Sequence, residues 1–480
     1  RMELLEAFKT YFQQGVANPP GNYTSYIIKA ENISRLQKLA ELLTKNHIKF
    51  AFGGNQNARG FNYDRQKEES FSVGRNDLIV NLHQPAAVLA DVLLEPKTLV
   101  SDTNTYDITA WALPYVYGLN AYASKENLKG LYPSLDLSMD QDAKTNATQL
   151  PLAWAFSWGS TENAKLLIAL QQANIKVRQA NAPFTIDKND YPAGTLLVMR
   201  AENERLDKEL AKTISKIATS QDGIFKTIST GFVDKGKDFG SDGYPLLTSA
   251  KVAIVFGDEV SSLGFGEVRF YLEHDLNLHP TIISVQNINS IDNAQVNTLI
   301  LPSGDYKDDI KEGLAAWVKR GGRLVLIEEA INGVIGKKGF DIKKRDTTTK
   351  KDDQKENFGS FANKSKSNFD DAIPGAIYKI NLDATHPISY GIGNTYYGLK
   401  TDDLIYKPFV QGWNIGEINN KSLMAGVVGK AVRKSLDAGL LIGSQDLGRG
   451  QVVYLATDPL FRNFWEIGKT LFNNVIFCDY

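Results

Sequence analysis

Cysteine is almost absent from this chain of 480 residues, in which Cys478 is the only one. A single cysteine excludes a disulfide within the chain and any metal cluster held by several thiolates. Histidine is also scarce: none of the five begins a His-x-x-Glu or His-Glu-x-x-His pattern, in which imidazoles are spaced to hold zinc. We therefore expect no metal-binding residue, and we interpret the histidines as surface or capping side chains.

The chain also lacks an excess of charge and a long apolar run. It has 54 basic and 55 acidic residues and a formal net charge of −1, so no long-range field favours nucleic acid or an anionic membrane as a partner. No apolar run approaches the roughly 20 residues that span a bilayer. No signal peptide is visible after Arg1. We interpret the chain as a fragment whose leader would lie upstream.

The length predicts two to four domains, and the spacing of apolar residues suggests where they divide. Residues 1–21 read as an edge helix and a linker that belong to an upstream domain. A first α/β unit is expected at 22–150 and a second, related unit at 151–245. The third unit, at 246–480, carries a charged insertion at 341–371 that is nearly free of aliphatic residues and is expected to be flexible and solvated.

The first two units share one pattern of strand, helix and strand. The interval of 18 residues from Ala30 to Ile48 recurs from Ser157 to Ile175. A helix that connects neighbouring strands makes them parallel, so the pattern predicts tandem β-α-β units of Rossmann-like or flavodoxin-like type, with parallel sheets flanked by helices. We interpret the repeat as an internal duplication. The alternative is that any two β-α-β units of ordinary length look alike.

In the third unit, three apolar segments read as buried parallel strands that end in polar turns: 251–258, 299–305 and 321–330. An open α/β sheet presents its site at the carboxyl ends of such strands. In amidotransferase-like sheets the third turn carries a nucleophilic cysteine, whereas here it carries Glu328, Glu329 and Ala330. Acyl transfer is therefore not expected, and no catalytic residue is assigned.

Acidic residues follow each of these strands. Asp258, Asp305, Glu328 and Glu329 are the candidate ligand-binding residues, because the ends of parallel strands meet at one edge. Converging carboxylates could hold a cation or a cationic ligand. Alternatively, these residues stabilise helix dipoles. Ser303 also ends a strand, but nothing marks a base for it, so an independent hydrolase is the least favoured interpretation.

A compact aromatic stretch, Tyr106-Asp-Ile-Thr-Ala-Trp-Ala-Leu-Pro114, reads as a buried anchor, because Tyr106 and Trp111 bring large apolar area. Together with several other motifs, it resembles the region downstream of the catalytic domain in large bacterial zinc carboxypeptidase-like proteins of the carboxypeptidase A type. The other motifs are Asn81-Leu-His-Gln-Pro85, Leu94-Glu-Pro96, Thr385-His-Pro-Ile-Ser-Tyr-Gly391, Gly448-Arg-Gly-Gln-Val-Val-Tyr454 and Asp458-Pro-Leu-Phe-Arg462.

The resemblance covers nearly the whole chain, and it implies that the third unit is a class I glutamine amidotransferase-like domain. It further implies a non-catalytic accessory or scaffold region of an exported metallopeptidase, periplasmic or secreted. The implied partner is the upstream peptidase domain in cis, and no cofactor belongs to this segment, because the zinc would lie in the domain before Arg1. The alternative is a module that binds a small ligand or peptide through Asp258, Asp305 and Glu328.

Overall fold

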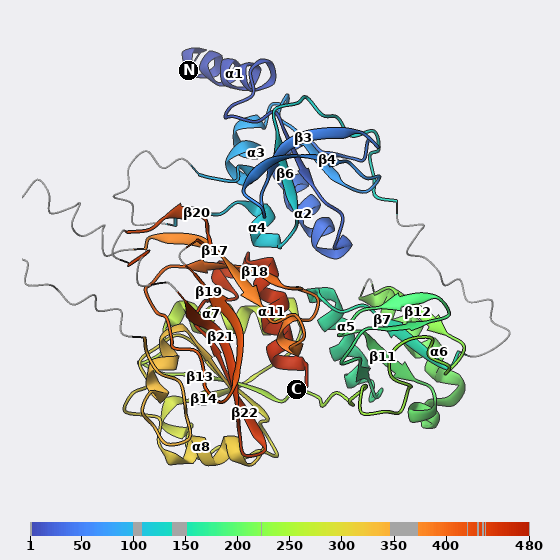
Figure 1. Ribbon diagram of the computed structural model, residues 1–480, viewed down its shortest axis with the longest axis vertical. Helices are drawn as coiled ribbons and strands as arrows, with labels where there is room; N and C mark the ends of the chain where they lie inside the picture. Colours follow the sequence, from blue (N-terminus) through green and yellow to red (C-terminus); the bar gives the residue numbers. More distant parts are fainter. Residues whose placement is uncertain are drawn as a thin grey trace, which may run out of the picture.

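The computed structural model shows three α/β units around a buried helix near the end of the chain, with a separate helix, α1 (Met2–Ala17), at the top of the view (Figure 1). The fold class is mixed α/β. The described residues are 2–98, 108–136, 151–221, 223–345, 373–419, 421–429, 432–433, 436 and 438–479. Most of the predicted insertion at 341–371 lies outside them.

The first unit is built on a six-stranded sheet in which all neighbouring strands are antiparallel. Across the sheet the strands are β2 (Ala51–Phe52), β5 (Leu78–Asn81), β1 (Ser25–Ile28), β6 (Ala121–Ser124), β3 (Asn57–Asn62) and β4 (Lys67–Ser72). Its helices are α2 (Ile33–Lys45), α3 (Ala87–Leu94) and α4 (Leu113–Tyr117). Tyr26 and Ile28 pack with the apolar sides of α2 and α3, whereas Ile27, on the other face, packs with Ala58 and Phe71 of the β3–β4 hairpin.

The second unit has a four-stranded antiparallel sheet. Its strands in spatial order are β12 (Phe225–Ile228), β7 (Ala153–Phe156), β11 (Leu196–Met199) and β8 (Arg178–Gln179), and a separate hairpin is formed by β9 (Phe184–Ile186) and β10 (Asn189–Tyr191). Its helices are α5 (Thr161–Gln172), the 3-10 helix η1 (Ala201–Leu206) and α6 (Asp207–Ser220). Trp154 and Phe156 face the helices, whereas Ala153 and Ala155 face the hairpin.

Both units have the order of elements and strands of a β-α-β-β-α-β, ferredoxin-like arrangement, with an added hairpin. The prediction of parallel sheets for these units was wrong. A helical crossover fixes only that its two strands run the same way. In each unit a later strand, β5 or β11, fills the gap between them and runs antiparallel to both. The shared order is what a duplication would produce, and the duplication itself stays a prediction.

Two predicted strands are also shorter or shifted. The segment 48–52 contributes only β2, and the segment 175–177 lies just before β8, which begins at Arg178. Each of these strands lies at an edge of its four core strands and has only two residues in the ladder. In both segments, apolar residues lie before the residues that pair in the sheet.

The third unit has a ten-stranded sheet that changes from parallel to antiparallel along its width. Its parallel strands are β14 (Thr281–Ser284), β13 (Val252–Phe256), β15 (Thr298–Leu301), β16 (Arg323–Ile327) and β22 (Gly450–Leu455). The antiparallel continuation consists of β21 (Gly439–Leu447), β19 (Trp413–Ile418), β17 (Gly375–Leu382), β18 (Thr395–Lys400) and β20 (Leu423–Val427). The three predicted parallel strands correspond to β13, β15 and β16, and the parallel part of the sheet contains two further strands, β14 and β22.

Helices cover the parallel part of this sheet. They include α7 (Ser262–Phe270), a π-helical turn η2 (Tyr271–Asp275), α8 (Glu312–Lys319), the 3-10 helix η4 (Glu328–Val334) and α11 (Glu466–Phe477). The glycine-containing segment 262–267 forms the first turns of α7. The Ser261 hydroxyl caps that helix by accepting the amide N–H of Gly264 at 3.2 Å.

Helix α11 joins the three units, and every one of its residues is buried. It contacts α4 of the first unit, α5 of the second, and both β18 and the 3-10 turn η6 (Pro387–Ser389) of the third (Figure 1). The Asn474 amide donates to the carbonyls of Ile388 at 2.7 Å and Tyr390 at 2.8 Å, and it accepts the indole N–H of Trp158. One continuous apolar core contains residues of all three units.

Close backbone contact also fixes the second unit against the third. A side-chain carbon at Gly391 would lie 2.3 Å from the Cα atom of Gly159, and both residues have positive φ angles. Glycine is therefore required at this crossing. The Arg35 guanidinium of the first unit donates to the Gly391 carbonyl at 2.7 Å, so the three units meet at this point.

The aromatic stretch at 106–114 only partly fits the predicted anchor. Tyr106 and Asp107 lie outside the described residues, and Trp111 is half-buried, with its indole donating to the Val92 carbonyl at 2.8 Å. Instead, Thr109 makes the connection: its buried hydroxyl donates to the Gly375 carbonyl at 2.6 Å and accepts the Val427 amide N–H at 2.8 Å. The stretch thus attaches the first unit to the antiparallel half of the third sheet.

Replacing Asn474 with leucine should destabilise the chain by about 2–4 kcal/mol, because two buried carbonyls and one indole N–H lose their partner. Urea unfolding of Asn474→Leu measures the loss. The control is Asn57→Leu, an exposed position on β3, for which a change below about 0.5 kcal/mol is expected. Equal losses in the two variants would contradict the role given to Asn474.

Candidate functional site

The four predicted ligand-binding residues all lie at the carboxyl edge of the parallel strands, but the structure divides them. Asp258 and Asp305 follow β13 and β15, which are drawn together beyond their ends by a bridge between Val260 and Gly304. Asp258, Asp305 and Glu329 are all exposed. Glu328 is the member of the set that is partly buried. It directly follows β16, at the position where a nucleophile was looked for in the sequence.

The backbone of Glu328 is strained. Its φ angle of 49° lies in the left-handed region, which residues with a side chain seldom adopt. Such conformations cost of order 1–3 kcal/mol and persist only where the surroundings impose them. The turn after β16 therefore holds this side chain in a fixed direction, as a strand-to-helix elbow does.

The surroundings of Glu328 favour its protonated form. Burial, with the negative charges of Asp402, Glu267 and Glu329, raises the pKa of Glu328 to about 7, although the Lys400 ammonium opposes the shift. Of the other predicted residues, Glu329 is among the groups that act on this carboxyl. The convergence of Asp258 and Asp305 with these two residues stays a prediction.

Glu328, Glu267 of α7 and Asp458, which follows β22, form what we call the carboxylate cluster. Burial raises the pKa of Asp458 well above its usual range, and the hydrogen bond and charge of Glu267, together with the charge of Glu328, add to the shift. Asp458 accepts the Leu460 amide N–H and Glu267 accepts the Arg462 amide N–H, each at 2.8 Å. These surroundings therefore favour the protonated form of Asp458.

Residues of β18, in the antiparallel half of the sheet, interact with this cluster. Lys400 of β18 is buried, and its ammonium donates to the Asp402 carboxylate and to the carbonyls of Leu404 at 2.9 Å and Ala456 at 3.0 Å. Tyr396, on the same face of β18, has a buried hydroxyl whose pKa is raised by burial and by the charge of Asp458. Among the described residues, neither this hydroxyl nor that of Thr457 makes a hydrogen bond of good geometry.

Sequence reasoning found Glu328 but missed Glu267 and Asp458. Glu267 lies in α7, and its contact with Asp458 is a tertiary one that the local pattern does not reveal. A usable signal for Asp458 did exist, because it follows a recognised strand, β22, as Asp258 follows β13. The pairing of β22 with β16 could not be deduced from local pattern, since more than 100 residues separate the two strands.

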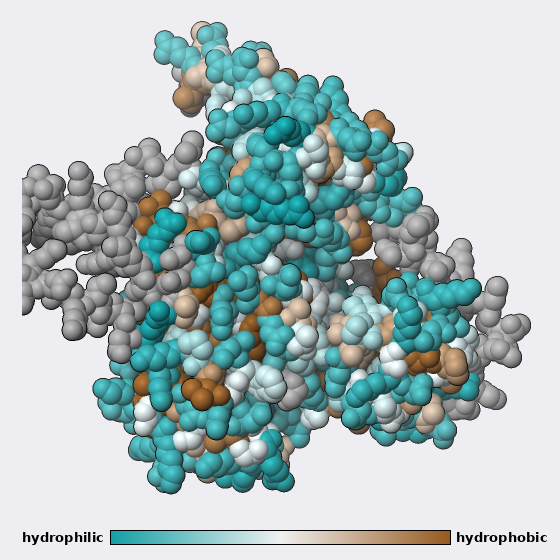
Figure 2. Space-filling model, viewed as in Figure 1, coloured by the Kyte–Doolittle hydropathy of each residue, from teal (hydrophilic) through white to brown (hydrophobic). Residues whose placement is uncertain are grey.

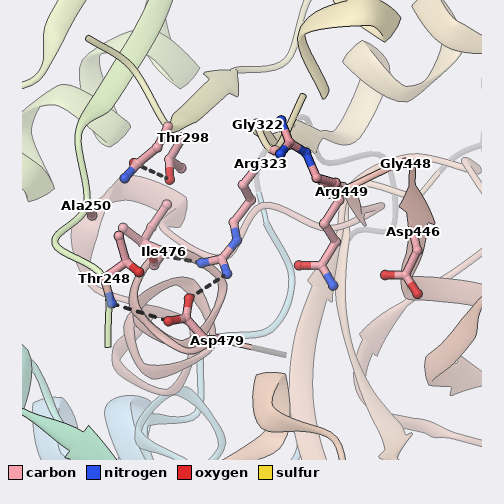
Figure 3. Close-up of a pocket in the computed structure, with 14 residues that line it drawn as sticks. Thr248, Ala250, Thr298, Gly322, Arg323, Asp446, Gly448, Arg449, Ile476 and Asp479 are labelled. Carbon is pink, nitrogen blue, oxygen red and sulfur yellow. Dashed lines mark hydrogen bonds and ion pairs between the residues drawn. The ribbon is translucent and has the colours of Figure 1, made fainter. Parts of the chain in front are cut away.

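A cavity of about 370 Å³ lies at the opposite edge, where β15, β16 and β22 begin (Figure 3). Arg323 extends there to the end of α11, donates to the carbonyls of Val475 at 3.1 Å and Ile476 at 3.0 Å, and pairs with Asp479 at 3.4 Å. A cation at a helix carboxyl terminus stabilises the helix dipole. This cavity thus contains a structural cap for α11.

Within the described residues, no three His, Cys, Asp or Glu side chains are placed to hold a metal ion. No helix in those ranges is both long and apolar enough to cross a membrane. Cys478 is buried after α11, and burial raises the pKa of its thiol to about 12, so it is a poor nucleophile.

Comparison with known proteins gives no family: no family model and no curated protein matches this chain. Similar solved structures include an exo-β-1,4-mannosidase from Opitutaceae bacterium strain TAV5 (10% identity, TM-score 0.26, 54% of this chain and 36% of that one). A β-galactosidase from Bacillus circulans sp. alkalophilus has 14% identity, a TM-score of 0.26, and coverage of 46% and 30%. A ThuA-like protein from Bacteroides uniformis has 11% identity, a TM-score of 0.28, and coverage of 47% and 91%.

The chain thus spans about a third of the length of the two glycosidases. At these TM-scores the similarities carry no argument about fold or activity.

Replacing Glu328 with glutamine should change how stability depends on pH. A carboxyl whose pKa is raised on folding, here from 4.5 to about 7, stabilises the fold below pH 4.5 and loses that contribution as the pH rises through 7. Thermal unfolding at pH 5 and pH 8 should therefore show the wild type losing on the order of 1 kcal/mol more than Glu328→Gln. Glu329→Gln, an exposed neighbour, is the control. A wild type whose pH profile matches that of Glu328→Gln would contradict the raised pKa.

Proposed function

We propose that this chain is a non-catalytic scaffold and accessory region that packs on a zinc carboxypeptidase-like domain of an extracytoplasmic protein. The observation that carries the proposal is the uncovered apolar face of α1, whose side chains project at the top of the molecule (Figure 2). The exposed apolar residues are Met2, Leu4, Leu5, Phe8, Tyr11 and Val16, with exposed fractions from 40% for Val16 to 81% for Met2.

Helix α1 is attached to the first unit only near its end. Gly15 packs against Ala87 of α3, and the Val16 carbonyl lies 2.8 Å from Nδ1 of His83. Isolated helices of this length are marginal in water, and a row of exposed apolar side chains marks an interaction surface. Because the family resemblance places a catalytic domain before Arg1, we assign the surface to that domain.

Two further features support a scaffold. The three units share one core around α11, so a partner bound at α1 would be held against a single body. The elbow after β16 presents Glu328 in place of a thiol or hydroxyl nucleophile. We propose that the third unit is a class I glutamine amidotransferase-like domain without that chemistry. No zinc ligand is assigned to this chain.

The first test compares the two faces of α1 in the whole protein that contains this chain. Leu4→Lys with Phe8→Lys should expose α1 to limited proteolysis and lower the kcat/KM of the peptidase by about tenfold, because a lost domain contact misplaces the cleft. Thr10→Lys with Gln13→Lys adds the same charge on the other side and should change neither. Unchanged proteolysis and kinetics in the apolar-face variant would rule out docking through α1.

A separate assay tests the absence of catalysis. The isolated chain supplied with zinc should release no amino acid from a blocked dipeptide, because we propose that the zinc ligands and the general base of the peptidase belong to the other domain. Measurable zinc-dependent turnover by this chain would overturn the proposal.

The carboxylate cluster supports a second candidate function, a ligand-binding module at the carboxyl edge. The strained turn at Glu328 and the buried hydroxyls of Tyr396 and Thr457 favour a ligand that donates several hydrogen bonds, such as a sugar or a peptide amino end. Calorimetric titration with triglycine at pH 8 should give heat that is lost in Glu328→Gln. An identical isotherm for both proteins, or no heat from either, would count against this function.

A further inference from the structure

A cavity of about 380 Å³ lies between the first two units, within the size range of small-molecule sites. One wall is the start of α2, and the other runs from the end of β7 to the start of α5, next to the start of β12. We propose that this cleft binds an organic cation, a guanidinium or ammonium group on an apolar stem. Such a group occurs in basic peptide side chains and in free amines.

The cleft has aromatic walls. Phe156, Trp158, Tyr191 and Phe225 line it, and the rings of Phe156 and Phe225 are 5.6 Å apart. Ile224, 45% exposed, adds apolar surface to the lining. Aromatic faces attract cations and also remove the apolar stem of such a ligand from water. These walls therefore fit a cation with a hydrocarbon stem better than a small hydrated ion.

The charge of the lining is mainly negative. Glu31, Glu162 and Asp190 contribute carboxylates, and Lys226 is the basic residue of the lining. Glu162 is the most informative of them: its Oε1 atom lies 3.0 Å from the Lys38 ammonium, whereas its buried Oε2 atom has no hydrogen-bond partner among the described residues. The Glu162 carboxylate thus has one of its two oxygens unpaired at the lining of the cleft, and a carboxylate there favours a cationic ligand.

Lys38 neutralises Glu162 only in part. The same ammonium lies 2.7 Å from Glu466 of α11, which Lys469 also approaches at 3.4 Å, so Lys38 is shared between two carboxylates. Two helix amino termini also border the cleft, and on their own they favour anions. Those termini are already occupied: Asn32 caps α2 and Ser160 caps α5, and Glu162 lies in the first turn of α5. The balance of charge thus favours a cation.

The walls are held in place before any ligand arrives. Lys38 joins α2 to both α5 and α11, and Arg35 of α2 donates to the Gly391 carbonyl of the third unit. Trp158 is fixed by its hydrogen bond to Asn474. A preformed cleft reduces the entropy that binding costs. The site depends on the packing of the three units and is independent of α1 and of the carboxylate cluster.

Calorimetric titration of the whole chain with agmatine and with N-acetyl-arginine amide tests the proposal, the first representing a free amine and the second a peptide side chain. At least one should bind with a Kd on the order of 1 mM or lower. Binding of both, or of either alone, supports a cation site and identifies its source. The neutral probe pentanol and inorganic phosphate should not compete.

Glu162→Gln should weaken binding at least tenfold, whereas Glu209→Gln, at an exposed position of α6 in the same unit, should leave it unchanged. Because Glu162 also holds Lys38, Phe225→Leu is the second variant: it removes an aromatic face, retains the charges, and should weaken binding without moving the melting temperature by more than about 4 °C. Glu328→Gln should bind like the wild type, which separates this site from the carboxylate cluster.

The proposal is overturned by any of three results. These are no binding of either cation at about 10 mM, tenfold above a 1 mM Kd; equal binding by Glu162→Gln and Glu209→Gln; or phosphate binding more tightly than the cations.

Discussion

The structure depends on the burial of a helix that still carries polar side chains. Helix α11 has no exposed face, yet it contains Glu466, Lys469, Thr470, Asn473 and Asn474. A buried polar group must find a partner, and on α11 these partners come from all three units. Thr470 donates to the Gly159 carbonyl of the second unit at 3.1 Å, and Asn473 accepts the Tyr271 hydroxyl of the third at 2.8 Å. Specific hydrogen bonds therefore determine how the units pack.

The charges on α11 follow the same logic. Burial raises the pKa of Glu466. The positive charges of Lys38 and Lys469 outweigh this effect and hold the pKa below its usual range. Lys469 also donates to Asp275 at 3.0 Å, so the chain of charges runs from α2 of the first unit to η2 of the third. Loss of one member would leave the others buried and unpaired. The same Lys38 joins α2 to Glu162 at the cleft between the first two units, which links the packing of the molecule to that cavity.

Local pattern predicted much of the secondary structure but not its pairing. The segments around β1, β7, β13 and β16 were recognisable as buried strands because their apolar runs are short and are followed by turns. The insertion of β5 between β1 and β2 could not be predicted, because a strand shows the same pattern of buried residues whether its neighbour is parallel or antiparallel. Glu328 was found from its place after a strand, whereas Glu267 and Asp458 join it only through tertiary contacts.

The central claim is that α11 makes three units into one body, and native-state hydrogen exchange measures this most directly. Amides in β1, β7 and β16 represent the three units, and those in α11 represent their common contact. The account predicts that the slowest amides in all four elements exchange through one opening reaction, with similar free energies and a common dependence on denaturant. Exchange of β7 through a separate opening, at markedly lower free energy and with α11 still protected, would contradict it.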